Sequence, residues 1–107
     1  MRAGTLRHRV TIQEKNVTQN EYGEEVITWD DVVTLWAAVE PLSGREFLEA
    51  QRAGAEVTTR IRIRHRDGIE PEMRASWGDH AYDIEAIIPI EERQREIHLM
   101  CREVISG

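Results

Sequence analysis

The most regular stretch of this chain is Val57-Thr58-Thr59-Arg60-Ile61-Arg62-Ile63-Arg64-His65-Arg66. Its side chains alternate, so that one face carries valine, threonine and isoleucine while the other carries mostly arginine. Alternation with a period of two is typical of a β-strand with one buried face. The stretch therefore predicts a strand packed on a core, and Asp67-Gly68 predicts a turn after it.

The same period recurs along most of the chain. Near the N-terminus, Val10 and Ile12 are expected on one face, and Tyr82, Ile84 and Ala86 are expected on one face of a later strand. Several short strands separated by turn signals predict an all-β fold, a small antiparallel β-barrel or sandwich. Strands are predicted over residues 7–15, 25–29, 34–40, 73–77, 81–88 and 96–104, with turns at Tyr22-Gly23 and Gly78-Asp79 and strand ends at Pro41 and Pro89.

One segment, residues 42–56, departs from this alternation. Ser43 can accept a hydrogen bond from the backbone N–H of Glu46, and the Glu46 side chain can accept from the N–H of Ser43. Leu42 can pack on Phe47 as a hydrophobic staple, and Gly54 is suited to end the helix. A short helix over residues 44–53 is therefore predicted inside a long loop between strands.

Length and composition limit the possible classes. A chain of 107 residues fits a single domain, residues 1–107. No apolar run approaches the roughly 18 residues of a membrane-spanning helix, and no secretory signal is expected. The single cysteine allows no intrachain disulfide and suits a reducing cytoplasm. A net charge of −6 argues against a free-standing nucleic-acid binder, which usually has a basic excess.

A search for reaction chemistry finds little. The four histidines do not stand at metal-ligand spacing, and Cys101 is expected to be a small buried hydrophobe. Asp79, His80 and Asp83 are best explained as a polar turn leading into a strand. Phosphate-loop, nucleophile-elbow and zinc-protease motifs are missing. We therefore expect no enzyme activity, no catalytic or metal-binding residues and no cofactor.

The most unusual feature is the arginine row, which we define as Arg60, Arg62, Arg64 and Arg66. Neighbours two apart on one strand face lie within about 7 Å, so these charges repel one another unless carboxylates face them. Glutamates of the same subunit are one source of partners. An inter-subunit surface is a second, with acidic segments such as Glu91-Glu92 of the next copy, and DNA phosphates are a third.

The insertion, residues 42–56, also allows two interpretations. It either caps one end of the barrel, with Phe47 and Leu48 in the core, or projects to meet a partner or line a channel. Trp29 and Trp36 are expected in the core, whereas Trp77 is a core or contact residue. Arg2, Leu6 and Trp77 are possible partner contacts. Candidate channel or inter-subunit contacts in the insertion are Leu42, Ser43, Arg45, Glu46, Phe47, Glu49, Gln51 and Arg52.

An ordered set of short motifs resembles that of phage head–tail joining proteins, also called head-completion, head-closure or stopper proteins. The resemblance covers nearly the whole chain. It consists of Met1-Arg2-Ala3-Gly4-Thr5-Leu6-Arg7-His8-Arg9-Val10-Thr11-Ile12-Gln13, Tyr22-Gly23, Trp29, Trp36-Ala37, Val39, Pro41-Leu42-Ser43-Gly44-Arg45-Glu46, Ile61, Ile63-Arg64 and Gly78-Asp79-His80-Ala81-Tyr82-Asp83-Ile84.

The resemblance implies a small β-barrel or sandwich that assembles as a ring, usually a dodecamer. Such a ring lies below the portal and its adaptor and offers a docking surface for the tail terminator or tail tube. Packaged double-stranded DNA passes through its lumen, and in this chain residues 42–56 would correspond to a loop that closes the channel. The implied location is the neck of a virion or of a phage-like gene transfer agent, assembled in the host cytoplasm, with no membrane partner.

Two rival functions remain at this point. One is a tail terminator or another neck protein, although adaptors of this machinery are usually mainly helical. The other is a small β-barrel that binds nucleic acid through the arginine row, with Trp77 or Tyr82 stacking on bases.

Overall fold

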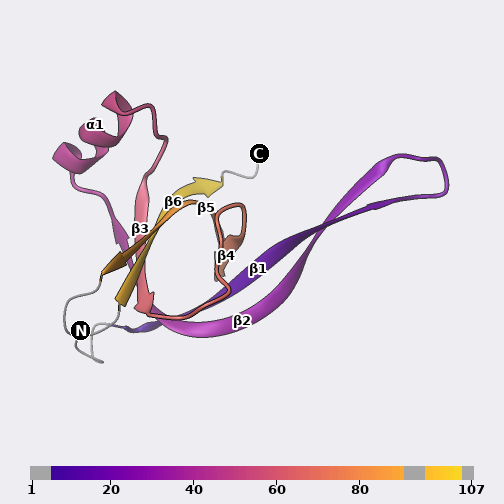
Figure 1. Cartoon of the computed structure of the whole chain (residues 1–107), viewed down its shortest axis with the longest axis horizontal. Helices are drawn as coiled ribbons and strands as arrows, with labels where there is room; N and C mark the ends of the chain where they lie inside the picture. Colours follow the sequence, from indigo (N-terminus) through magenta and orange to yellow (C-terminus); the bar gives the residue numbers. More distant parts are fainter. Residues whose placement is uncertain (1–5, 91–95, 105–107) are drawn as a thin grey trace.

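The computed structural model describes residues 6–90 and 96–104, arranged as Figure 1 shows. Most of these residues lie in strands, and one short helix interrupts them. The predicted all-β class with a short helix between strands is therefore confirmed. The elements are β1 (His8–Gln19), β2 (Glu25–Pro41), α1 (Gly44–Arg52), β3 (Thr59–Arg64), β4 (Arg74–Trp77), β5 (His80–Ile90) and β6 (Glu96–Val104).

The six strands form one antiparallel sheet that closes on itself into a small barrel. Around the barrel the order is β1, β2, β3, β6, β5 and β4, and β4 pairs with β1 to complete the circle. Closure satisfies both edges of each strand within the barrel wall and removes the open edges that promote aggregation. The barrel is therefore a rigid base for the elements that extend from it.

The apolar halves of the alternating strands fill the barrel interior. Ile61 and Ile63 of β3 are fully buried, with Val57 and Thr59 buried beside them, so the face predicted from residues 57–66 is confirmed. Because successive side chains point to opposite faces, the arginines between them lie outside the core. The other core residues are Val10, Ile12, Ala37, Ile69, Ala75, Tyr82, Ile84, Ile97, Leu99 and Cys101.

Where two strands were predicted within residues 25–40, the structure has one strand, β2, of 17 residues. Asp30-Asp31 separated the two predicted strands, but both aspartates are exposed and hydrogen-bonded across the hairpin. Gln13 Nε2 donates to Asp31 Oδ1 at 2.9 Å, and Asn16 Nδ2 donates to Asp30 Oδ2 at 3.2 Å. Acidic side chains are compatible with a strand where both of its faces meet water.

β5 also differs from its prediction. Pro89 was expected to end this strand, yet the strand continues to Ile90, with Pro89 opposite Ile97. A register shift between Ile84 and Ala86 exchanges the faces of the residues that follow, because the side-chain period is two. Ala86 is therefore exposed, contrary to the prediction, and Ile87 packs against the core instead.

Two elements extend away from the barrel (Figure 1). The far part of the β1–β2 hairpin is a long twisted ribbon, which we call the arm (residues 13–31), and α1 stands clear of the barrel near the other end of the long axis. The described chain measures 51 × 31 × 24 Å, and the arm accounts for much of its length.

Candidate functional site

The turn at the tip of the arm is organised by Asn20. Its side-chain Oδ1 accepts from the backbone N–H groups of Tyr22 and Glu24, at 2.9 and 3.0 Å. Gly23 donates its N–H to the Asn20 carbonyl at 3.0 Å and has a φ of 79°, a left-handed conformation that glycine adopts without strain. The predicted Tyr22-Gly23 turn is confirmed, and it leaves Tyr22 79% exposed at the tip.

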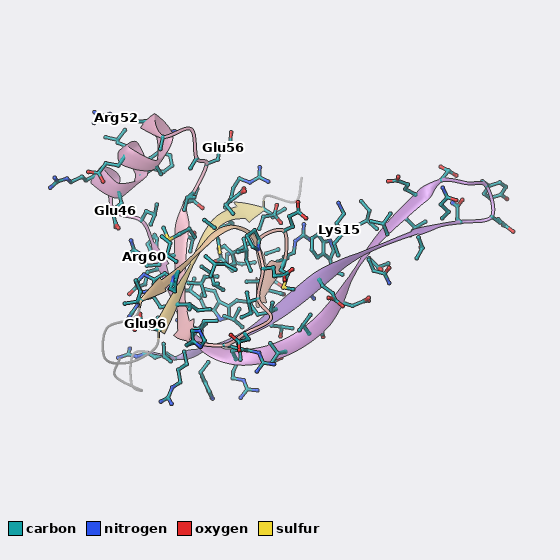
Figure 2. The ribbon with its side chains drawn as sticks, in the orientation of Figure 1. Lys15, Glu46, Arg52, Glu56, Arg60 and Glu96 are labelled. Atoms are coloured by element: carbon teal, nitrogen blue, oxygen red, sulfur yellow. The ribbon has the colours of Figure 1, made fainter. Side chains whose placement is uncertain are left out.

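The arm has no core of its own. Every residue from 14 to 28 is exposed, and Lys15 lies where the arm leaves the barrel (Figure 2). At this base the Arg74 guanidinium lies 4.0 Å from the centre of the Trp29 ring. Because an isolated two-stranded hairpin is only marginally stable in water, a partner that covers the arm would stabilise it. Its exposed apolar side chains are Val17, Tyr22, Val26 and Ile27.

The arm also accounts for most of the net negative charge of the chain. Six of its residues are acidic and one, Lys15, is basic, so the arm contributes −5 to the net charge of −6. A field of this sign attracts a basic partner and repels nucleic-acid phosphates. The acidic residues are Glu14, Glu21, Glu24, Glu25, Asp30 and Asp31.

The second projection, α1, begins with the capping box that the sequence predicts. Ser43 Oγ accepts from the Glu46 N–H at 3.2 Å, and the Ser43 N–H donates to Glu46 Oε1 at 3.2 Å. No residue of the helix is buried, and Leu48 is 53% exposed. The interpretation that placed Phe47 and Leu48 in the core is therefore wrong, and the insertion projects.

The other predicted contact residues of the insertion lie on or near this helix. Arg45 Nε lies 3.4 Å from Glu49 Oε1 one turn along the helix, and Arg52 is exposed. Phe47 and Gln51 face a hollow of about 550 Å³ between the helix and the barrel. Leu42 stays attached to the barrel, because its N–H donates to the Thr58 carbonyl at 3.0 Å.

Replacing Ser43 with alanine is expected to unravel the first turn of α1 without destabilising the barrel. Loss of an N-cap costs about 1 kcal/mol, which corresponds to about fivefold faster amide exchange in the helix. Hydrogen exchange followed by NMR measures this, with Ser43→Asp as the control that keeps a capping side chain. Equal protection in the alanine variant would contradict the assigned role of the capping box.

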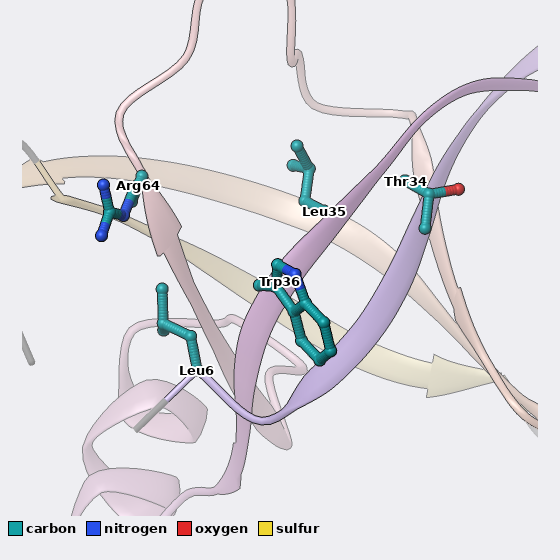
Figure 3. Close-up of a pocket in the computed structure, with 5 residues that line it drawn as sticks. All are labelled: Leu6, Thr34, Leu35, Trp36 and Arg64. Carbon is teal, nitrogen blue, oxygen red and sulfur yellow. The ribbon is translucent and has the colours of Figure 1, made fainter. Parts of the chain in front are cut away.

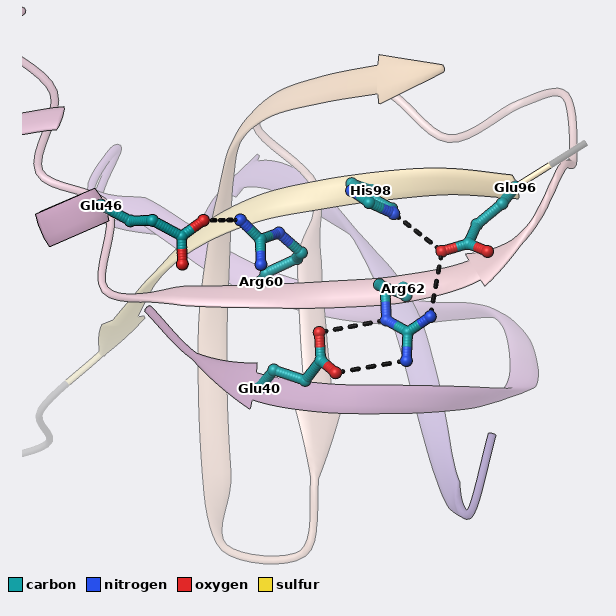
Figure 4. Close-up of polar contacts among 6 residues, drawn as sticks. All are labelled: Glu40, Glu46, Arg60, Arg62, Glu96 and His98. Carbon is teal, nitrogen blue, oxygen red and sulfur yellow. Dashed lines mark hydrogen bonds and ion pairs between the residues drawn. The ribbon is translucent and has the colours of Figure 1, made fainter. Parts of the chain in front are cut away.

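Part of the arginine row is neutralised within the subunit (Figure 4). Arg60 pairs with Glu46 and so ties α1 to β3. Arg62 makes a fork with Glu40, with Nε–Oε1 and Nη2–Oε2 distances of 3.0 and 3.2 Å. Its Nη1 also lies 3.3 Å from Glu96 Oε1. Of the three predicted sources of negatively charged partners, glutamates of the same subunit therefore serve Arg60 and Arg62.

The pKa values within this network reflect the pairing. Burial by itself would raise the pKa of Glu96, but hydrogen bonds from His98 and Arg62 outweigh burial and hold it below the usual value. His98 Nε2 lies 2.7 Å from Glu96 Oε1. Burial would likewise lower the pKa of Arg62, but Glu40 and Glu96 raise it. The hydrogen bond from Arg60 lowers the pKa of Glu46. The network therefore favours the charged forms of Glu46, Arg62 and Glu96.

The last two arginines of the row, Arg64 and Arg66, differ from Arg60 and Arg62 in their exposure and pairing. Arg64 and Arg66 are both exposed, and neither has an ion-pair partner among residues 6–90 and 96–104. Arg64 is the last residue of β3, whereas Arg66 lies beyond the strand. The proposed partner segment Glu91-Glu92 and the candidate contact Arg2 lie outside the described residues. Within the described part of the chain, Arg64 therefore has no carboxylate partner, unlike Arg60 and Arg62.

An apolar hollow of about 580 Å³ lies beside Arg64 (Figure 3). Leu6 and Arg64 border it on one side and Trp36 on the other, with Thr34 and Leu35 completing the lining. Trp36 is 53% exposed, so the prediction that placed it in the core is wrong. The Arg9 guanidinium lies 5.0 Å from the Trp36 ring centre, where a cation–π contact places a second positive charge near the hollow.

Two other candidate residues, Trp77 and Asp83, contact side chains of their own subunit. Trp77 is half-buried against the core and lies with its ring centre 4.3 Å from that of His8 and 5.7 Å from that of His80. Asp83 lies 3.3 Å from Arg74 Nε and 3.0 Å from Arg102 Nη2. The described residues contain no cluster of histidine, cysteine and acidic side chains suited to a metal ion.

The cysteine is the core residue that the sequence predicts. Cys101 is fully buried, and burial, with Glu85 and Asp83 nearby, raises the pKa of its thiol to about 12. A thiol with this pKa stays protonated near neutral pH, and the thiolate is the reactive form. Cys101 therefore contributes packing to the barrel.

Comparison with known protein families gives a match over nearly the whole chain. The model of the family described as "Phage head completion protein" matches residues 1–104. The chain belongs to the phage head completion protein family. Membership confirms the family resemblance seen in the sequence and identifies a structural protein of the phage head.

One solved structure extends this result. The head completion protein described here is similar to protein SF1141 from Shigella flexneri 2a, known from a solution structure. The two are 34% identical, the match covers 100% of both chains, and the TM-score is 0.75. No curated protein matches the chain. Within the described part of this head completion protein, no helix has the length and apolar character needed to cross a membrane.

Proposed function

We propose that this head completion protein is a connector subunit, copies of which form a ring between the portal or its adaptor and the tail. The observation that carries the proposal is the exposed arm, a hairpin that carries apolar side chains far from any core of its own subunit. A neighbouring copy in a ring would cover such an element and so stabilise both.

The charge distribution supports a ring whose lumen passes or retains double-stranded DNA without binding it tightly. The arm is acidic, and Arg60 and Arg62 already pair with carboxylates. Phosphate binding gains its strength from free cationic groups that replace condensed counterions. The intramolecular pairing therefore favours a connector over a nucleic-acid-binding module that uses the arginine row.

The test compares particles made with and without this protein by electron microscopy. Without the connector we expect DNA-filled heads that lack tails or have lost DNA, and the purified protein is expected to form rings at high concentration. Normal tailed particles in its absence would reject the role. Filled, stable heads accompanied by tails of irregular length would instead support the tail-terminator alternative.

The helix has its own test. Deleting residues 44–53 joins Ser43 to Gly54, which keeps the insertion closed and leaves the barrel strands intact. Because no residue of α1 is buried, we expect the variant to stay folded by circular dichroism while it yields leaky or tailless heads. Fully infectious particles from this deletion would show that α1 neither closes the channel nor contacts a neighbour.

A further inference from the structure

The hollow at the end of the barrel has the features of a receptor for an acidic aromatic group. Its lining is mostly apolar, with Leu6, Leu35 and the exposed face of Trp36. Positive charge stands at its border, because Arg64 lines it and Arg9 lies against Trp36. Neither Arg9 nor Arg64 forms an ion pair with a carboxylate among residues 6–90 and 96–104. A ligand that fits would bring an apolar ring together with negative charge.

The tip of the arm presents this combination. Tyr22 is the most exposed of the large apolar side chains in the described chain, and Glu21 and Glu24 lie on either side of the Tyr22-Gly23 pair. The hydrogen bonds of Asn20 hold this turn in one conformation, so docking it costs little ordering entropy. Tyrosine is enriched among the residues that dominate binding energy at interfaces.

A subunit cannot place its own tip in its own hollow. The arm is a continuous ladder from Gln13 opposite Asp31 to Gln19 opposite Glu25, and it points away from the barrel. β3 ends and β1 begins at the end of the barrel far from the arm tip (Figure 1). Tip and hollow are therefore different patches on opposite ends of one molecule. Contacts between such patches are heterologous, and they close into rings when the rotation between copies allows it.

We propose that the arm tip of one subunit docks in the hollow of the next copy, with Tyr22 against Trp36 and Leu6 and its flanking glutamates facing Arg64 and Arg9. This inference rests on the proposed ring. It identifies the two surfaces that make the ring contact and gives the ring a direction, because each subunit donates one arm and receives another.

The first test measures self-association by analytical ultracentrifugation in low salt. Tyr22→Ser and Arg64→Glu are each expected to weaken association by about tenfold or more, because each removes a central contact. Arg66→Glu makes the same charge change outside the hollow and is expected to have a clearly smaller effect. Equal weakening by the Arg64 and Arg66 variants would show that only overall charge matters and would overturn the proposal.

The second test mixes the two variants at a concentration where each alone is expected to be monomeric. The Arg64→Glu chain keeps a working arm, and the Tyr22→Ser chain keeps a working hollow. Mixed together, they share one intact contact and are expected to form a 1:1 dimer that does not grow, as native mass spectrometry can detect. A mixture that stays monomeric, or grows into rings, contradicts a tip-to-hollow contact.

A third measurement separates this inference from the connector role. In particles built with a Glu21→Cys and Thr34→Cys chain, which keeps Tyr22, oxidation is expected to produce a ladder of linked subunits, while Cys101 stays buried and unreactive. The single Glu21→Cys chain is the control and should give at most dimers. If particles form normally but no cross-linked ladder appears, the docking proposal is wrong, and the connector role still stands. Tailed particles that do not need the protein would overturn the role itself.

Discussion

A chain that lacks residues 16–19 and 25–28 is expected to fold into a stable barrel and yet to fail in assembly. The deletion removes four residues from each strand of the arm, so the turn from Asn20 to Glu24 follows Lys15 directly and precedes Trp29. Because four is an even number, every remaining side chain keeps its face. The tip keeps its chemistry but moves back by about 13 Å, at about 3.3 Å per residue.

The two readouts are the melting temperature of the purified chain and the number of tailed particles. The melting temperature should stay unchanged, because every residue from 14 to 28 is exposed. The number of tailed particles should decrease by orders of magnitude, because the shortened arm no longer reaches a neighbour. A full-length chain with Val17→Thr and Ile27→Thr is the control for lost apolar surface. If the shortened chain assembles normally, the arm is not an assembly element.

Replacing Arg62 with glutamate is expected to be the most destabilising surface change. Arg62 is about one-fifth exposed and holds Glu40 and Glu96 together, so the variant would place a third carboxylate between two others. Loss of one member of a largely buried ion pair costs about 3 kcal/mol of the free energy of unfolding. Urea denaturation measures this, and Arg64→Glu is the matched control, with a change within about 0.5 kcal/mol.

Acid provides a second readout of the same network. The folded pKa of Glu96 is lower than its ordinary value of 4.5, so its contribution to stability is complete above that value and is lost as the pH falls through the folded pKa. In the Arg62→Gln variant, the loss of unfolding free energy that Glu96 causes as the pH falls should become smaller. Identical unfolding curves for the Arg62 and Arg64 variants at neutral pH, with the same acid dependence, would refute the assigned role of the network.

Family membership gives both predictions their functional meaning. A structural protein of the phage head acts through its contacts with other molecules. The closed barrel with an ion-paired outer face is a stable base, and in the proposed ring the arm and α1 are the parts that would reach other subunits. Stability and assembly should therefore separate by position, with Arg62 acting on the first and the arm on the second.

Local patterns in the sequence predicted the local structure well. Alternation over residues 57–66 placed Ile61 and Ile63 inside, and the capping box of Ser43 and Glu46 marked the start of α1. Both patterns depend on residues a few positions apart in the chain, whose geometry the backbone dictates. The buried Cys101 and the Tyr22-Gly23 turn were predictable for the same reason.

The sites that involve distant segments were not predictable in this way. Alternation shows that Trp36 and Leu35 point to opposite sides, but it does not show which segment covers either side, and Trp36 is largely exposed. The turn of the arm was predicted but its length was not, because the predicted strands left out residues 16–19 and 30–33. A signal was available in the β-branched residues Val17 and Thr18 before the turn and Val26, Ile27 and Thr28 after it.

The sequence by itself determined the all-β class, the faces of the strands and the helix cap, because these follow from backbone geometry over a few residues. Only the tertiary structure decided that Arg62 pairs with Glu40 and Glu96 and that the strands close into a barrel. It also decided that the β1–β2 hairpin extends beyond the barrel as the arm. These features depend on the register between strands far apart in the chain, which the packing of the whole core selects.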